Sequence, residues 1–334
     1  MLSESFEKLK KSEKFFFTLH FLGLNKLKKI MSLTIKILGC GSALPTTIRN
    51  ASAQILNHNN KLFLIDCAES TQISIRRANI RFASINNIFI SHLHGDHFYG
   101  LFGLLSSFAL TGRKSVMHIY CPEKLINMLS SPFSPVNLDD LGFQIEFHIL
   151  NPSGVNMIFE DKTFQAYSVP LKHRIPTWGF IFKEKLLQRN IKKDCIEKYQ
   201  ISIAEIVQIK LGSDLRLSDG TIIPNSELTT DPPKPKSYAY ISDTLSFDGI
   251  AKAVSNIDVL YHEATYDSSL EKRAKETFHC TTFQAAENAL KANVGKLVLG
   301  HFSSRYQDVK ILENEAKTIF PNTFCAFDGM EIEV

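Results

Sequence analysis

The heptapeptide SHLHGDH constrains the fold of this 334-residue chain more than any other feature. It holds His92, His94, Asp96 and His97 directly after the apolar run Ile88–Ile90, which is typical of a buried strand. In the loop that leaves a strand, histidines at i and i+2 can converge on one metal ion, and the Asp-His pair behind them can hold a second. Imidazole with carboxylate suits zinc and its neighbours. The chain must therefore bring further ligands to this loop.

Strand-like and helix-like segments alternate from Met31 onward, which indicates an α/β protein. The predicted strands are 33–38, 53–56, 62–65, 88–90, 117–120, 143–148, 163–169, 238–241, 259–261 and 296–299. The predicted helices are 70–78, 100–110 and 282–291. Before the last of these, Thr281 and Gln284 have the spacing of a capping box. No repeat of about 20–50 residues is evident, which excludes a solenoid.

Three residues have positions that suit further ligands. His173, Asp243 and His301 each follow an apolar strand-like run, as the metal loop does, and so fit an arrangement in which strand ends meet at one edge. His118 and His148 lie inside alternating runs and are interpreted as ordinary strand residues. His173, Asp243 and His301 are therefore the candidates that complete the site.

The composition is that of an ordinary globular protein, with 44% hydrophobic and 22% charged residues. Six scattered cysteines form no CxxC pair, which argues against a thiolate zinc site and favours a reducing cytoplasm. The net charge is +4, and seven lysines and three glutamates within residues 1–30 account for all of it. The remainder is neutral, so any contact with nucleic acid requires a local patch.

Residues 1–30 are expected to be an N-terminal extension, disordered or not translated, because Met31 directly precedes the first strand-like run. The apolar run Phe15–Leu24 is too short to span a bilayer and has no small-residue cleavage site after it. A basic interfacial helix there stays open. We expect no membrane partner.

Seven motifs together resemble the ribonuclease Z family of the metallo-β-lactamase superfamily. They are LGCGSALPTTIRN (38–50), FLIDCAESTQ (63–72), FISHLHGDHFYGLFGLL (89–105), ISDT (241–244), HEATY (262–266), HCTTFQAA (279–286) and GHFSSRY (300–306). The resemblance covers nearly everything from Leu33 onward. It implies an αβ/βα four-layer sandwich over 31–334, with metals at one edge and an inserted flexible arm, the exosite, at about 183–236.

The resemblance also implies a ligand set for two Zn²⁺ ions per subunit. His92, His94 and His173 would hold the first ion. Asp96, His97 and His301 would hold the second ion, and Asp243 would bridge the two.

The activity implied is removal of the 3′ trailer from precursor tRNA, which leaves a 3′-hydroxyl on the tRNA and a 5′-phosphate on the trailer. A metal-activated hydroxide would attack phosphorus. Asp96 would orient the water or accept its proton, and His279 would donate a proton to the leaving 3′ oxygen. Glu263 would fix the tautomer of His279 and raise its basicity. Arg305, Ser303 and Asn50 are candidate RNA contacts.

The segment 183–236 carries ten basic and eight acidic residues and lacks the Gly-Pro usual in short-form relatives. By resemblance it grips the tRNA body through phosphate contacts, and the protein is a cytoplasmic homodimer. Two alternatives stay open. Another dinuclear hydrolase of the same fold that acts on a small substrate would need no arm. A catalytically silent scaffold or RNA-binding subunit would be expected to lack ligands.

Overall fold

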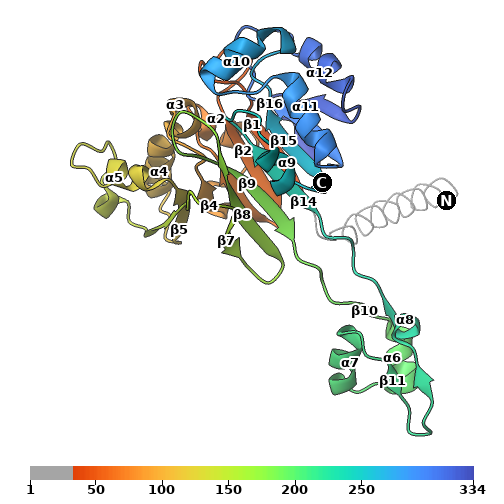
Figure 1. Cartoon of the computed structure of the whole chain (residues 1–334). Coiled ribbons are helices and arrows are strands. Elements are labelled where there is room, and N and C mark those ends of the chain that lie inside the picture. The colour runs from red at the N-terminus through yellow and green to blue at the C-terminus, as the bar shows by residue number, and fades with distance from the viewer. Residues whose placement is uncertain (1–32) are drawn as a thin grey trace, which may run out of the picture.

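A computed structural model describes residues 33–334, so the predicted N-terminal extension lies outside the described residues. Two seven-stranded sheets pack face to face (Figure 1). The first has the order β18-β1-β2-β3-β4-β5-β6. Its strands are β1 (Leu33–Gly39), β2 (Ala53–His58), β3 (Lys61–Ile65), β4 (Ile85–Phe89), β5 (Met117–Cys121), β6 (Ile145–Ile149) and β18 (Glu331–Glu333). Strands β3 to β6 run parallel, and the other pairs are antiparallel.

The second sheet has the order β17-β16-β15-β14-β9-β8-β7. Its strands are β7 (Asn156–Glu160), β8 (Phe164–Leu171), β9 (Thr177–Glu184), β14 (Ser237–Ile241), β15 (Val259–Glu263), β16 (Lys296–Gly300) and β17 (Thr323–Cys325). The parallel strands β14 to β17 form one half, and antiparallel β7, β8 and β9 form the other. Strand β9 was not predicted, because its continuous apolar run is buried almost throughout and does not alternate.

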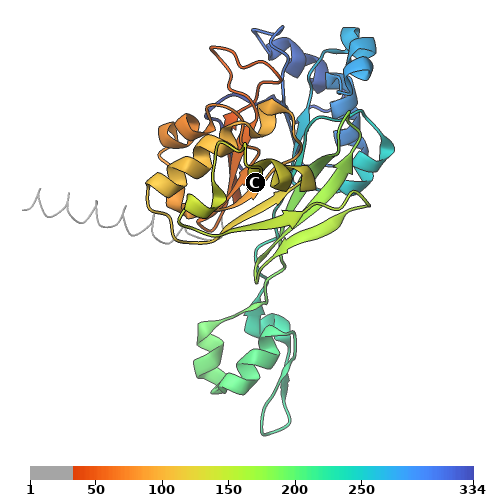
Figure 2. The same cartoon turned by 90° about the vertical axis from the view of Figure 1, so that its left-hand side faces the viewer.

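Helices cover the outer face of each sheet and give the predicted four layers (Figure 2). The first sheet carries α2 (Thr71–Arg77), α3 (Gly95–Phe98), α4 (Gly100–Leu110) and α5 (Glu123–Leu129). The second carries α9 (Asp248–Ala253), α10 (Glu271–Thr277), α11 (Thr282–Lys291) and α12 (Lys310–Lys317). Short 3₁₀ turns lie at Phe82–Ser84, Leu138–Asp140 and Ser268–Leu270. The predicted capping box is present, since Thr281 and Gln284 bond each other's backbone at the start of α11.

The apolar pattern explains why the layers pack. Helix α4 buries Leu101, Leu104, Leu105 and Phe108, which lie at i, i+3, i+4 and i+7 and so share one face. Between the sheets, aromatic rings fill the core; the ring of Phe89 lies 5.4 Å from that of Phe180 on the opposite sheet. This core fixes the two sheets relative to each other and therefore the loops at their shared edge.

The segment between β9 and β14 stands away from the sandwich on two extended stretches (Figures 1 and 2). Its elements are β10 (Asn190–Ile191), α6 (Lys193–Tyr199), α7 (Ile203–Lys210), β11 (Leu215–Arg216), β12 (Ile222–Ile223), α8 (Asn225–Leu228) and β13 (Thr229–Thr230). They enclose a small core of their own. The apolar run 201–209 forms most of α7, where Ser202 and Glu205 make a capping box. Within residues 33–334, no helix has the length and apolar character needed to cross a membrane.

Candidate metal centre

All seven predicted ligands lie where strands end at one edge of the sandwich. His92 and His94 follow β4, and Asp96 and His97 belong to the short helix α3. The remaining three follow strands of the second sheet: His173 follows β8, Asp243 follows β14 and His301 follows β16. The structure thus brings together from both sheets every residue predicted as a ligand.

The first group of donors surrounds the Nδ1 atom of His94. The Nε2 atoms of His92 and His173 lie 3.1 and 3.2 Å from it. Oδ2 of Asp243 lies 3.5 Å from Nε2 of His92 and 3.8 Å from Nε2 of His173. Ligand atoms about 2.0–2.1 Å from a tetrahedral zinc ion lie roughly 3.3 Å apart, so this spacing fits one ion.

The second group uses the other oxygen of the same aspartate. The Nε2 atoms of His97 and His301 are 3.3 Å apart, and each lies 3.2 Å from Oδ1 of Asp243. Each also lies 3.5 Å from Oδ2 of Asp96. Asp243 therefore presents one oxygen to each group, which is the arrangement a bridging ligand requires.

Left-handed backbone aims two of these side chains. Asp243 and His301 have φ values of 52° and 57°, a region that non-glycine residues seldom adopt. Such conformations cost free energy and persist where surrounding structure imposes them. Here the chain turns sharply just after β14 and β16, so both side chains face the first sheet.

Hydrogen bonds behind three of the histidines fix their ring orientation and aim their inward nitrogens at the ligand groups. Nδ1 of His97 donates to Oδ2 of Asp66 at 2.7 Å, and Nδ1 of His173 donates to the Phe278 carbonyl at 2.9 Å. Nδ1 of His301 lies 3.0 Å from the Thr265 hydroxyl, whose proton goes to Glu263. An imidazole that donates from one nitrogen presents a lone pair on the other. Burial also lowers the pKa of His173, which favours its neutral form.

Asp66 was not among the predicted site residues. It lies directly after β3, is buried, and accepts hydrogen bonds from the hydroxyls of Tyr240 and Ser91 at 2.8 and 2.9 Å. A buried carboxylate with this many donors holds His97 in one orientation. The signal that could have found it is an aspartate at the end of an apolar strand, the same signal that identified Asp243.

His279 and Glu263 form a buried ion pair beside the ligands. Nδ1 of His279 lies 3.0 Å from Oε1 of Glu263, which also accepts the Thr244 amide at 2.8 Å. Burial opposes charge on His279, but Glu263 and then Asp243 and Asp96 outweigh it and raise its pKa to about 9. His279 therefore carries a proton at neutral pH.

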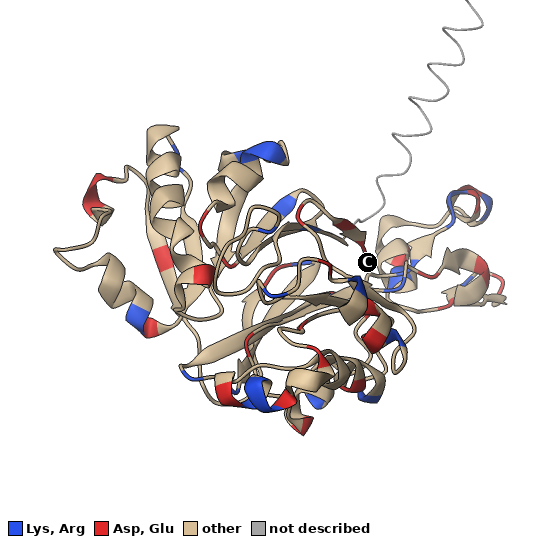
Figure 3. Cartoon of the chain, turned by 90° about the horizontal axis from the view of Figure 1, so that it is seen from above, with Lys and Arg blue, Asp and Glu red and all other residues tan. Residues whose placement is uncertain are grey.

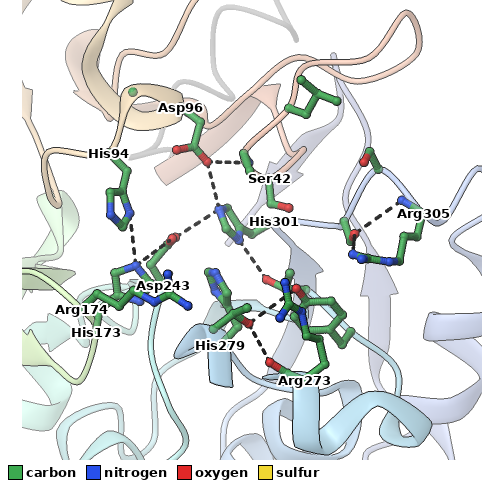
Figure 4. A pocket seen from close by; sticks show the side chains of 18 of the residues that line it. Ser42, His94, Asp96, His173, Arg174, Asp243, Arg273, His279, His301 and Arg305 are labelled. Carbon is green, nitrogen blue, oxygen red and sulfur yellow. Dashed lines mark hydrogen bonds and ion pairs between the residues drawn. The ribbon is translucent and has the colours of Figure 1, made fainter. Parts of the chain in front are cut away.

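A cavity of about 540 Å³ opens over these groups (Figure 4). Arg305 and Ser303 lie on its wall, with Nη1 of Arg305 donating to the Ser303 hydroxyl at 3.3 Å. Arg174 and Arg273 also line it and were not predicted, since lone arginines on loops and helices carry no local signal.

Asn50 does not line this cavity. Its Nδ2 donates to the Leu38 carbonyl and the Ser74 hydroxyl at 3.2 and 3.1 Å, and it borders a neighbouring hollow. A contact between Asn50 and RNA stays a prediction.

Comparison with known proteins identifies the family. Residues 33–187, less than half of the chain, match the family model of the anti-Pycsar protein Apyc1. Ribonuclease Z of Phocaeicola vulgatus is 43% identical over 300 residues, which cover 90% of this chain and 97% of that protein. Ribonuclease Z of Porphyromonas gingivalis is 42% identical over 303 residues, 91% of this chain and 99% of that one.

Solved structures are similar to this chain as well. Human tRNase Z, short form (ELAC1), superposes with a TM-score of 0.64 and 28% identity, covering 90% of this chain and 98% of that one. The metallo-β-lactamase fold protein YhfI from Bacillus subtilis, 14% identical, shares the fold with a TM-score of 0.65 and covers 91% of this chain and 100% of its own. The fold and family predicted from the motifs are confirmed, and the chain belongs to the ribonuclease Z family.

Proposed function

We propose that this protein is a zinc-dependent endoribonuclease that removes the 3′ trailer from precursor tRNA, leaving a 3′-hydroxyl on the tRNA and a 5′-phosphate on the trailer. One observation carries the proposal: two donor groups share Asp243, and His279, which pairs with Glu263, borders the same cavity. The names of its relatives, ribonuclease Z and tRNase Z, support the substrate.

The donor set suits two zinc ions. Each group combines imidazole nitrogens with carboxylate oxygens, and the donor atoms within each lie within 4.8 Å of one another. Nitrogens of five histidines face one another and the carboxylates of Asp243 and Asp96 across these two groups, an arrangement that bound cations would stabilise. When bound, a zinc pair lowers the pKa of water and offsets the charge of the phosphate.

Asp96 would act on the attacking water. Its Oδ2 accepts the Ala43 amide at 2.6 Å, and the side chain lines the cavity beside His301. Nearby His97 and His301 outweigh the effect of burial and lower the pKa of Asp96, so it is ionised at neutral pH. A fixed, ionised carboxylate at this place can orient water and accept its proton.

His279 would protonate the departing 3′ oxygen. Its ring lies 5.3 Å from that of His301, so it is next to the ligand groups, where the scissile phosphate would bind. Glu263 remains ionised because the effect of His279 outweighs burial and lowers its pKa. It can therefore hold the imidazolium without taking its proton.

The rim and the arm would bind RNA. Arg305 has a planar guanidinium suited to a phosphate, and Ser303 orients it. Figure 3 shows lysines and arginines interspersed with acidic residues along the elements, as the near-neutral composition predicts. Arm 183–236 would contribute phosphate contacts to the tRNA body. By family resemblance we propose a cytoplasmic homodimer in which one subunit's arm holds the tRNA that its partner cleaves.

The test is cleavage of a labelled precursor tRNA with a 3′ trailer by the zinc-loaded protein, with Asp96→Ala as the paired variant. A cut just after the acceptor stem that disappears in the variant is the expected result. Intact precursor together with hydrolysis of bis-p-nitrophenyl phosphate would instead favour a small-substrate phosphodiesterase of the same fold.

A further inference from the structure

We propose that His118, Glu146 and His148 form a further metal site, for a zinc-class divalent ion, on the edge of the first sheet. These residues lie on β5 and β6, on the opposite side of β4 from β3, and none of them lines the cavity of the metal centre. The inference is independent of the proposed nuclease activity.

Strand register brings the three side chains together. His118 pairs directly with Glu146 across the two strands, and Tyr120 pairs with His148. The alternate residues, Ile119 among them, pack toward the helices on the other face. His118, Glu146 and His148 therefore share the face toward the second sheet.

The donor spacing is that of a metal site. Nδ1 of His118 lies 3.2 Å from Nε2 of His148 and 3.2 Å from Oε2 of Glu146, and the three donor atoms lie within 4.8 Å of one another. A tetrahedral zinc ion separates its ligand atoms by roughly 3.3 Å. One proton on Nδ1 of His118 can satisfy only one of its two neighbours, whereas a cation satisfies all three.

The site is partly rigid and open to solvent. The ring of His148 stacks on Tyr120 with centroids 4.4 Å apart, and Tyr120 stacks on Phe89 at 4.4 Å. The side chains of His118 and Glu146 are 34% and 45% exposed. Stacking orients one ligand, and exposure leaves a coordination position for water, as in three-ligand zinc sites.

A buried oxygen lies in the next strand of the same row. Asn87 of β4 pairs with His118, and within residues 33–334 its Oδ1 is buried without a hydrogen-bond partner. A buried acceptor without a partner is costly, and a metal-bound water could supply the missing donor. The three candidate ligands and this unpaired acceptor therefore lie on neighbouring strands of one sheet.

Zinc content tests the proposal. The wild-type protein and the variants Glu146→Gln and His148→Gln are loaded with ZnCl₂, passed through gel filtration and measured by plasma mass spectrometry. We expect each variant to bind one zinc ion fewer per chain than wild type while precursor tRNA cleavage is unchanged. Because the readout is a difference, it does not depend on how many ions the main centre holds.

Glu331→Gln on β18, the opposite edge strand of the same sheet, is the matched control and should retain the wild-type zinc content. Equal zinc content in wild type and both folded variants would overturn the proposal. Hydrogen exchange of wild-type protein needs no variant: added zinc should slow amide exchange in 117–121 and 145–149. If zinc slows exchange in neither strand, the proposal is also overturned.

Discussion

The substitution Glu263→Gln examines how the protein would protonate a leaving group. It removes the charge that lies 3.0 Å from Nδ1 of His279 while keeping the size of a buried side chain. His279 has a pKa raised to about 9 from its ordinary value of 6.5, with Glu263 the largest of the charges that raise it. At about 1.4 kcal/mol per pKa unit, that difference amounts to roughly 3 kcal/mol of preference for the imidazolium.

Without the carboxylate, the pKa of His279 should fall toward its ordinary value, because Glu263 is the largest of the charges that raise it and burial lowers it. At about pH 7.5 nearly all of wild-type His279 is protonated, whereas a smaller fraction would be protonated in the variant. A donor acts only in its protonated form. Wild-type cleavage should therefore persist to about pH 9 and decline above it, whereas cleavage by the variant should begin to decline at a lower pH.

The assay is single-turnover cleavage of precursor tRNA across this pH range, together with hydrolysis of bis-p-nitrophenyl phosphate. The nitrophenolate leaves without needing a proton, so Glu263→Gln should slow its release less than it slows tRNA cleavage; the remaining effect arises because Glu263 also holds Thr265, which contacts His301. His279→Ala should slow tRNA cleavage about 10²- to 10⁴-fold at every pH with metal retained. Equal slowing of both substrates by Glu263→Gln, or an unchanged pH profile, would contradict a role for His279 as the proton donor.

Four further changes probe the ligands, the arm and the core. His94→Ala should lose bound zinc and all cleavage, measured by mass spectrometry beside the RNA assay; retained zinc would contradict its place as a ligand. Asp66→Asn should weaken metal affinity about 10- to 100-fold in a chelator competition, because His97 loses its acceptor. Replacing 185–233 by a Gly-Ser turn should spare bis-p-nitrophenyl phosphate hydrolysis and raise the half-saturating concentration of tRNA; unchanged tRNA cleavage would contradict the arm assignment. Leu104→Ala should cost about 2–5 kcal/mol in urea unfolding, since this side chain is fully buried.

Local pattern and motif content were sufficient for much of this protein. Strand and helix alternation predicted the α/β class, and Thr281 with Gln284 predicted the start of α11 because a capping box involves only neighbouring residues. The spacing of His92 to His97 indicated metal ligands for the same reason: a loop of six residues needs no distant partner to gather its side chains. The motifs then indicated the ribonuclease Z family.

Other features depended on contacts between distant segments. Strand β9 is apolar on both faces, so no alternation marked it. Asn50 is drawn away from the cavity by bonds to Leu38 and Ser74, while Arg174 and Arg273 converge on it from separate elements. No pattern in the neighbouring residues predicts any of these placements.

Short-range periodicity and motifs were enough to establish the class of fold, the family and the identities of the metal-ligand candidates. Contacts between distant segments established which oxygen of Asp243 faces which group of histidines, and that Asp66 orients His97. It also decided that His118 and His148, interpreted from sequence as ordinary strand residues, meet Glu146. This difference arises because alternation within a strand specifies the face on which a side chain lies. Which residue lies opposite it on the neighbouring strand depends on strand register, and register is set by packing of the whole core.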